Sequence, residues 1–361
     1  MKQYLHIIRE EIPSFTDEEI FEDVKNTSLN SIDLLVVRGV LERYFGFEIP
    51  DELWFRNKTI GDSLNYFHTN SNQNNIDSGK HTKKIEKSEV IEVRMPQMAN
   101  EGLSESWLLK YLGDFHWNLI SLGFNMKSSE FYDNENQRLY ATFVRINYSL
   151  PGLRIFTENE MLNFSGKIES YGKSTFISEI VGSGNRNTID AKLMTVFSVK
   201  IDNGNVIDKA KMDGINNTIP QIKKVSGFLT DYNAIKKGLI AELDTAVGKF
   251  DILNNEVLFE KDYYINPFID INGVGLLYFA AYPIISDACL LSFSELKGFS
   301  GYETIYRDIL YYGNCDANDL LKVQLHSLEK TNDKISLITS IIRKKDNYLL
   351  AKIITIKKAS S

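Results

Sequence analysis

One polar stretch divides this chain and decides how many folding units it can form. Residues 69–89 read TNSNQNNIDSGKHTKKIEKSE, with Ile76 and Ile85 as the only apolar side chains. Such a segment cannot bury enough surface to offset the entropy of ordering its backbone, and it is typical of a flexible linker. It separates about 68 residues from about 270. We therefore expect a small head and a large body to fold as separate units.

Charge and cysteine content exclude several classes of protein. The chain has 48 acidic and 41 basic residues, whereas a dedicated nucleic-acid binder needs excess Lys and Arg to displace counterions. Cys289 and Cys315 lie apart without metal-ligand spacing, which excludes a disulfide framework and a zinc ribbon. No apolar run reaches the ~20 residues of a spanning helix, and no signal peptide opens the chain. We expect a cytoplasmic protein that binds neither nucleic acid nor membrane and holds no metal.

The head and the body follow different patterns. In the head, apolar residues at helical spacing occur from Tyr4 to Ile8, from Ser31 to Phe45 and, after a possible Thr59 cap, from 60 to 67. The body has β-branched and aromatic runs over 139–148, 174–181, 193–201, 335–342 and 348–356. Helical patterns over 104–122 and 273–282 interrupt these runs. The body is thus predicted to be α+β, with a sheet wrapped around one central helix in each half.

The head carries a recognisable signature around Ser31. The run LNSIDLL at 29–35, followed by LERYFGFEIP at 41–50, resembles an acyl carrier protein over residues 1–68. The resemblance implies that Ser31 bears 4′-phosphopantetheine and that a phosphopantetheinyl transferase is a partner. A phosphodiester there would lie against the N–H groups and the positive dipole end of a helix, although Ser31 could also be an N-cap only. The Asp that usually precedes the serine is Asn30 here. Ser28 is the alternative, but it would require three extra helical residues.

The second half of the body contains a motif that binds thioesters in other proteins. Residues 270–282, DINGVGLLYFAAY, resemble the hot-dog thioesterase motif D-x-D-x-x-G-x-x-Y-x-x-x-Y. In that fold, a glycine such as Gly275 lets backbone N–H groups approach the thioester carbonyl and stabilise negative charge. The second acid of the motif, the hydrolytic carboxylate of several thioesterases, is Asn272 here. An amide is neither base nor nucleophile at neutral pH, so the motif argues against simple hydrolysis.

The first half of the body carries a second resemblance. Residues 95–117, MPQMANEGLSESWLLKYLGDFHW, resemble the leinamycin-type acyltransferase/decarboxylase family, over roughly residues 92–361. Members are double hot dogs that decarboxylate methylmalonyl-CoA and leave propionyl on a carrier arm. The functional tyrosine of the family corresponds best to Tyr140, with Tyr132 as the alternative. His116 fits a hydrogen-bonded core histidine better than a proton carrier.

Decarboxylation of a malonyl-type thioester requires few acid–base groups. It requires hydrogen-bond donors on the forming enolate oxygen, in a poorly solvated pocket. The candidate donors are side chains and backbone N–H groups from both halves of the body: Tyr140, Asn272, Asn100 and Ser104, with the backbone around Gly102 and Gly275. An acyl-tyrosine intermediate and direct capture by the carrier thiol both remain open.

These observations predict four segments. Residues 1–68 form a carrier domain, 69–90 a linker, 91–215 a first hot-dog domain and 216–361 a second. We expect the body to convert a (methyl)malonyl-CoA-type thioester into a short acyl group on the arm of Ser31, with polyketide or fatty-acid synthase components as further partners. The short linker would keep the arm at roughly millimolar effective concentration. The alternatives are a thioesterase or dehydratase acting on carrier-bound acyl chains, and a non-catalytic acyl-carrier binding protein.

Overall fold

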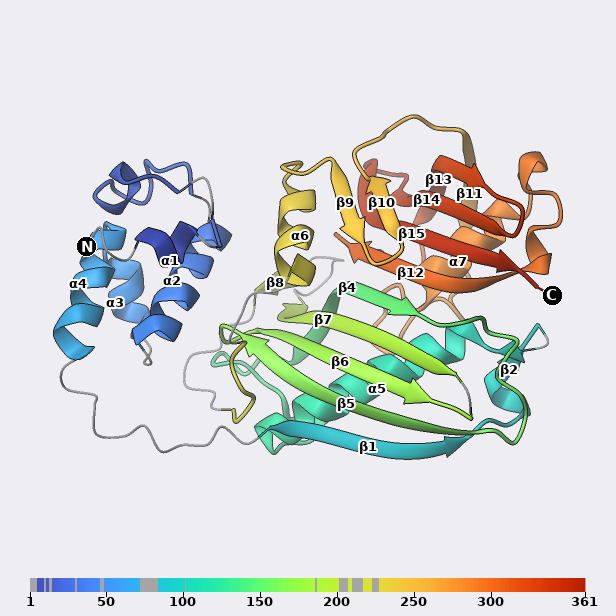
Figure 1. The fold of residues 1–361 in the computed structure, drawn as a ribbon, viewed down its shortest axis with the longest axis horizontal. Helices are drawn as coiled ribbons and strands as arrows, with labels where there is room; N and C mark the ends of the chain where they lie inside the picture. Colours follow the sequence, from blue (N-terminus) through green and yellow to red (C-terminus); the bar gives the residue numbers. More distant parts are fainter. Residues whose placement is uncertain are drawn as a thin grey trace. The chain divides into compact units, whose positions relative to one another are not determined.

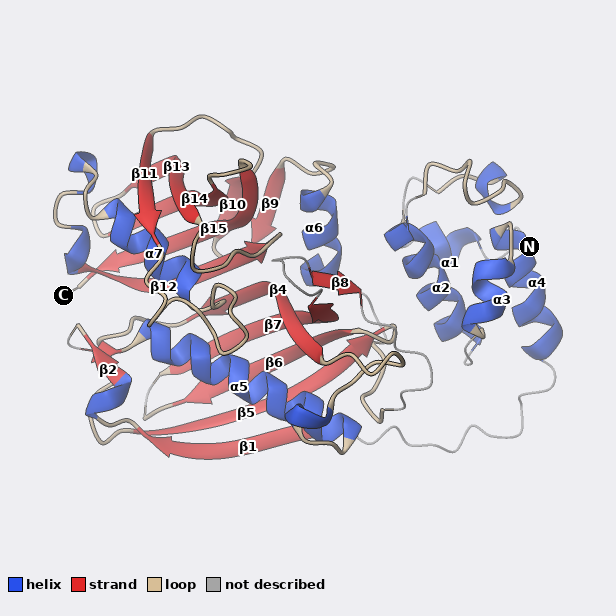
Figure 2. Cartoon of the chain, turned by 180° about the vertical axis from the view of Figure 1, so that it is seen from behind, coloured by secondary structure: helices blue, strands red, loops and turns tan. Residues whose placement is uncertain are grey.

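The structure is a computed structural model, shown from two sides in Figures 1 and 2. It describes residues 5–9, 11–12, 15–29, 31–45, 49–71, 84–100, 102–185, 187–200, 207–209, 217–222 and 227–360. The chain divides into two compact units, of which the first comprises residues 1–82 and 221–227 and the second residues 83–220 and 228–361. Most of the predicted linker, residues 72–83, lies outside the described residues.

The head is helical where it is described. Its helices are α1 (Leu5–Arg9), α2 (Ser31–Phe45), α3 (Asp51–Arg56) and α4 (Ile60–Ser71), with a short 3-10 turn at Glu18–Ile20. The cap before α4 is reciprocal, because Asp62 N donates to Thr59 Oγ1 and Thr59 N donates to Asp62 Oδ2, each at 3.0 Å. Helix α2 contacts both α1 and α4, and Ile8, Val37 and Phe67 are completely buried. Helix α3 was not predicted.

One large antiparallel sheet organises the described part of the body. Its strand order is β1-β5-β6-β7-β4-β12-β15-β14-β13-β11, with β8 paired to β7. The strands of the first half are β1 (Ile85–Glu92), β4 (Leu139–Ser149), β5 (Met161–Tyr171), β6 (Thr175–Ser183), β7 (Thr188–Lys200) and β8 (Ile207–Lys209). Those of the second half are β11 (Phe259–Tyr264), β12 (Tyr302–Tyr311), β13 (Leu320–Lys330), β14 (Lys334–Arg343) and β15 (Tyr348–Ala359). Two short hairpins are separate from the sheet, β2 (Met98–Ala99) with β3 (Gly102–Leu103) and β9 (Glu242–Thr245) with β10 (Gly248–Asp251).

The two halves of the sheet repeat one topology. Each half has an outer strand, then a helix, then four strands, and the strand that follows the helix lies at the junction. The helices are α5 (Glu105–Phe124) in the first half and α7 (Ala281–Leu290) in the second, and α6 (Gly227–Lys236) lies between the halves in sequence. Figure 2 shows α5 lying across the strands of its half. Strands β4 and β12 join the halves, with Ile146 opposite Ile309.

The N-terminal end of the body corrects one predicted boundary. Residues 85–90, which their polar composition assigned to the linker, belong to β1, where Ile85 pairs with Ile168 of β5. Strand β1 lies at the edge of the sheet, and its residues are mostly half-buried or exposed. An edge strand needs few apolar side chains because its pairing supplies the order. Composition alone therefore could not distinguish it from linker.

Helix α5 forms the core of the first half. Ser104 caps it, because its Oγ accepts a hydrogen bond from Trp107 N at 3.3 Å. The helix ends at Asn125 in the left-handed conformation, with a φ of 51°. Leu108, Leu112 and Leu119 are completely buried. In the part of the chain that the structure describes, no helix is both long and apolar enough to cross a membrane.

Candidate functional site

The segment between β11 and α7 folds as hydrogen-bonded turns, and the predicted helix over 273–282 is wrong. Asn272 Oδ1 accepts hydrogen bonds from Val274 N at 3.0 Å and Leu276 N at 3.1 Å. Gly275 has a φ of 79°, which glycine adopts without strain. The Asn272 side chain thus offers the backbone an alternative to helical hydrogen bonds. Helix α7 begins only at Ala281.

A second acceptor braces the start of this segment. The buried Asp270 Oδ2 accepts hydrogen bonds from Tyr263 Oη at 2.9 Å and Asn266 N at 2.8 Å. Burial and the Asp270 carboxylate raise the pKa of the Tyr263 hydroxyl, so that it stays a donor. Asp270 therefore stabilises the turn. Its Oδ2 atom already accepts two hydrogen bonds, so this oxygen is not available to act as a general base.

The turn is fixed against the first half of the body by contacts on three elements. The Phe279 ring lies against Gly113 of α5, where a Cβ atom would come within 2.4 Å of Phe279 Cζ. The same ring is 4.2 Å, centroid to centroid, from Phe143 of β4. At the end of β7, Lys200 Nζ donates to Val274 O at 2.7 Å. The segment 270–280 therefore lies at the junction of the two halves.

Two backbone donors stand just before α7. Among the residues that the structure describes, the N–H groups of Phe279 and Ala280 have no acceptor, whereas Tyr278 N donates to Asp270 O at 2.7 Å and Ala281 N to Tyr278 O at 2.8 Å. Ala280 is completely buried. Buried N–H groups usually have an acceptor, either in the protein or in water, so these donors are available to a bound ligand. These two adjacent donors are suited to an oxygen that develops negative charge.

Tyr140 lies at the same end of the sheet as this turn. It is half-buried on β4, where it pairs with Ser198 of β7, two residues before Lys200. The Arg138 guanidinium carbon is 5.9 Å from the centroid of the Tyr140 ring. Because side chains alternate along a strand, Tyr140 and Phe143 point to opposite faces of β4. The sequence alternative, Tyr132, is exposed on the loop before β4 and forms a backbone bridge with Arg138.

Asn100 and Ser104 lie elsewhere. Asn100 is exposed, with a φ of 50°, in the turn between β2 and β3. Ser104 is next to Glu105, which contacts Tyr148 near the far end of β4. Tyr148 is eight residues from Tyr140, about 26 Å at ~3.3 Å per strand residue. The structure therefore brings Tyr140 and the Asn272 turn to one end of β4 and places Ser104 at the other.

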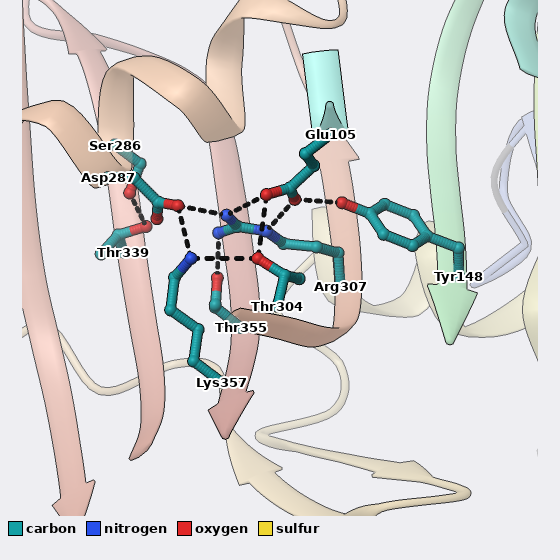
Figure 3. A network of polar contacts seen from close by, with 9 residues as sticks. All are labelled: Glu105, Tyr148, Ser286, Asp287, Thr304, Arg307, Thr339, Thr355 and Lys357. Carbon is teal, nitrogen blue, oxygen red and sulfur yellow. Dashed lines mark hydrogen bonds and ion pairs between the residues drawn. The ribbon is translucent and has the colours of Figure 1, made fainter. Parts of the chain in front are cut away.

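A buried network of ion pairs and hydrogen bonds surrounds Glu105 at the start of α5 (Figure 3). The sequence analysis did not predict this network. The Arg307 guanidinium lies between the carboxylates of Glu105 and Asp287, with Nε 2.8 Å from Glu105 Oε1 and Nη2 2.6 Å from Asp287 Oδ2. Lys357 Nζ is 2.7 Å from the same Asp287 oxygen. Tyr148 and Thr304 donate hydrogen bonds to Glu105, Thr355 accepts one from Arg307, and the Thr304 hydroxyl also accepts one from Lys357 Nζ. The network joins α5, α7, β12 and β15 across the junction.

Charges within this network control the ionisation of Glu105. Burial alone would raise the pKa of its carboxyl, but the charges of Arg307 and Lys357 outweigh burial and lower that pKa to about 2. Glu105 thus stays ionised and occupied by Arg307, Tyr148 and Thr304. The only sequence signal was an acidic residue in the first turn of a helix. We interpret the network as a set of ion pairs that holds the two halves of the body together.

His116 lies in the core of the first half. It is completely buried, with Nδ1 2.7 Å from Ser178 Oγ and Nε2 2.8 Å from Thr195 Oγ1. Burial lowers the pKa of its imidazole to about 3. The ring is therefore neutral at pH 7 and its nitrogens are occupied by two hydroxyl groups. This placement agrees with a core histidine.

In the head, the two candidate serines have different positions. Ser31 is the first residue of α2, while Asn30 and the side chain of Ser31 lie outside what the structure describes. Ser28 precedes the helix, and its hydroxyl donates to Glu19 Oε1 at 2.5 Å. Ser31 therefore stands at a helix N-terminus, whereas Ser28 lies before the helix with its hydroxyl bonded to Glu19.

Comparison with known proteins relates the body to one fold. No protein-family model and no curated protein matches the sequence. A solved structure from Lactobacillus plantarum, described as an oleoyl thioesterase, has a TM-score of 0.53 at 9% identity, over 76% of this chain and 95% of its own. The 12:0-ACP thioesterase from Umbellularia californica has a TM-score of 0.50 at 8% identity, over 76% and 98%. An acyl-ACP thioesterase from Bacteroides thetaiotaomicron has 0.50 at 10%, over 75% and 97%.

The body has a hot-dog fold. The large antiparallel sheet with its central helices confirms this part of the sequence prediction. At such low identity the likeness extends to the fold and to nothing finer.

Proposed function

We propose that the body acts on acyl thioesters, and that it decarboxylates a malonyl-type donor and delivers the acyl group to an arm on Ser31. The adjacent N–H groups of Phe279 and Ala280, which have no acceptor among the described residues, carry this proposal. They lie at the junction of the halves, beside the Asn272 turn. A thioester carbonyl placed there would receive two hydrogen bonds.

The chemistry follows from what these donors stabilise. When the C–C bond to the carboxylate breaks, CO₂ leaves and the electron pair of that bond stays on the acyl group as an enolate. The two N–H groups stabilise the enolate oxygen. Water then protonates the α-carbon. The thiol of the arm attacks the carbonyl carbon and gives up its proton, the bond to the CoA sulfur breaks as the new thioester forms, and the departing CoA thiolate takes up that proton. Asn272 and Asp270 serve here to hold the turn, since their side-chain oxygens already accept backbone hydrogen bonds.

The arm itself rests on the resemblance of the head to a carrier protein and on the position of Ser31. A phosphopantetheine phosphate on Ser31 would stand at the N-terminus of the 15-residue helix α2, where helix dipoles favour negative charge. When bound, the arm supplies the thiol that carries the acyl group. Phosphopantetheinyl transferase and the components of a polyketide or fatty-acid synthase are the proposed partners.

Intact-mass measurement tests this function. The full chain, loaded with 4′-phosphopantetheine by a transferase, is incubated with malonyl-CoA or methylmalonyl-CoA. We expect an acetyl or propionyl group on the arm with release of CO₂, and no loading of the Ser31→Ala variant. Retention of the whole malonyl group on the arm, or no reaction of either donor, would refute decarboxylating transfer.

Hydrolysis is the second candidate, because the three solved structures compared above are described as thioesterases. Release of a free acid with an unacylated arm would support it. The donor pair itself is tested by Ala280→Pro, which removes one N–H group, with Ala280→Gly as the matched variant that keeps it. We expect the proline variant alone to lose turnover at least tenfold, and the unfolding temperatures of both variants separate this loss from a loss of folding.

A further inference from the structure

A pocket on the first half of the body is lined by residues outside the Asn272 turn and the donor pair. Its volume is about 340 Å³, within the range of small-molecule sites. The end of β1, the 3-10 turn Met95–Gln97 and the first two turns of α5 form it. The lining side chains combine a flat aromatic wall with a polar rim: Ile91, Glu92, Arg94, Gln97, Trp107 and Tyr111.

The aromatic wall is rigid. The rings of Trp107 and Tyr111 stack with centroids 5.2 Å apart and planes 18° from parallel. The Tyr111 hydroxyl donates to the carboxylate of Glu89, which Lys87 Nζ also contacts at 2.6 Å. Trp107 is half-buried. A fixed, partly open indole is a stacking surface for another planar ring.

The polar rim presents a donor and an acceptor side by side. Arg94 Nη2 donates to Glu92 Oε2 at 2.8 Å, and its side chain is 68% exposed. The Gln97 side chain is held in place, because its Oε1 accepts a hydrogen bond from Arg94 N at 2.9 Å. A carboxylate, a guanidinium and an amide at the rim match a heterocycle that carries an amino group and ring nitrogens. Adenine is such a heterocycle.

Lys110 follows Trp107 by three residues on α5 and precedes Gly113, which lies against Phe279, by three. Trp107, Lys110 and Gly113 follow one another at three-residue steps on α5, so the row from Trp107 to Gly113 extends about 9 Å along the helix. The exposed Lys110 has its Nζ 5.4 Å from the centroid of the Tyr278 ring, next to Phe279. Phosphate groups passing from the pocket toward Phe279 would meet this ammonium group.

We infer that the pocket binds the adenine nucleotide end of an acyl-CoA donor, with the base on Trp107 and a phosphate at Lys110. The order of chemical groups along CoA (base, phosphates, thioester arm) matches the order of pocket, cation and donor pair on the protein. The choice of CoA rests on the proposed function. The contacts of the base rest on the pocket, and the phosphate contact rests on the position of Lys110.

Binding without turnover tests the pocket independently of the reaction. Adenosine 3′,5′-bisphosphate, which is the nucleotide end of CoA without its arm, is titrated into the full chain by calorimetry. We expect Trp107→Leu to weaken binding by about fivefold to a hundredfold, as loss of one stacking aromatic does. Lys110→Gln, at an exposed position, should weaken it by several-fold. Leu122→Ala, at an exposed position further along α5, is the matched control and should bind normally.

Three results would overturn the inference. One is equal affinity of Trp107→Leu, Lys110→Gln and the unaltered chain for the bisphosphate. Another is equal affinity for ATP, which would make the site a general nucleotide site. The third concerns the difference in KM between malonyl-CoA and malonyl-pantetheine. We expect this difference to be smaller in Trp107→Leu than in the unaltered chain, and an equal difference in both proteins would contradict the inference. Bisphosphate binding without turnover would keep the pocket and refute the reaction, and turnover without bisphosphate binding would do the reverse.

Discussion

Replacing Arg307 with leucine should destabilise the body by about 3–5 kcal/mol, the usual cost of removing one partner from a buried ion pair. The Arg307 side chain is completely buried and donates hydrogen bonds to Glu105, Asp287 and Thr355. Without it, Asp287 keeps Lys357 at 2.7 Å, but Glu105 keeps only two hydroxyl donors, Tyr148 among them. An uncompensated carboxylate remains at the start of α5.

The loss should depend on pH in a defined direction. In the native chain the pKa of Glu105 is lowered from 4.5 to about 2, because Arg307 and Lys357 outweigh burial. A lowered pKa contributes stability that is present above pH 4.5 and is lost as the pH falls toward 2. In Arg307→Leu, burial dominates and raises that pKa. The difference in unfolding free energy between the two proteins is therefore largest at neutral pH, begins to shrink as the pH falls through the raised pKa of Glu105 in the variant, and shrinks further between pH 4.5 and about 2.

Calorimetry and urea unfolding measure this effect. At ~2–4 °C per kcal/mol for a domain of this size, the expected fall in Tm is about 6–20 °C. Lys249→Ala, which removes the exposed ion pair with Glu242, is the control and should leave the midpoint nearly unchanged. Adding Glu105→Gln to Arg307→Leu should cost less than the sum of the single changes. If the losses in unfolding free energy of the two single variants add up in the double variant, or if Arg307→Leu loses less than about 1 kcal/mol, the network does not hold the two halves together.

Three further changes test the site and the core. Gly113→Ala places a Cβ atom 2.4 Å from Phe279 Cζ, so it should lower the unfolding free energy by about 1–3 kcal/mol in urea although alanine favours a helix. Asn272→Asp keeps both acceptor bonds of the turn and adds a carboxylate; the intact-mass assay should show the arm-bound product shifting toward free acid, whereas Asn272→Ala should lose turnover. The imidazole NMR signals of His116 should not titrate between pH 5 and 8, because burial lowers its pKa to about 3; a titration in that range would contradict its placement in the core.

Local signals predicted four of the described helices and five strands of the large sheet. The Thr59 hydroxyl and the apolar spacing that follows it specify α4, and Ser104 marks the start of α5. Such caps and periodicities act between residues a few positions apart. The β-branched runs predicted strands β6, β7, β4, β15 and β14, whose side chains are buried on one or both faces of the sheet. They did not predict β12, which lies at the junction.

The same local reasoning failed where the backbone follows side-chain hydrogen bonds. The apolar residues of 273–282 have helical spacing, yet the Asn272 oxygen and the positive φ of Gly275 turn the chain until Ala281. The motif match placed Asn272 at the candidate site, but it did not identify the N–H groups of Phe279 and Ala280 as the donors there. Their importance comes from which N–H groups have no acceptor, and this depends on every neighbour in space.

The amino-acid sequence by itself determined the division into head and body, the serine at the start of α2, and the alternation that makes the body a sheet around helices, because each depends on composition or on spacing along the chain. Only the tertiary structure decided that Tyr140 shares an end of β4 with the Asn272 turn while Ser104 lies at the other, and that Arg307 joins Glu105 to Asp287. These pairs are far apart in sequence. Their contacts depend on how two halves of one sheet register, which no local pattern encodes.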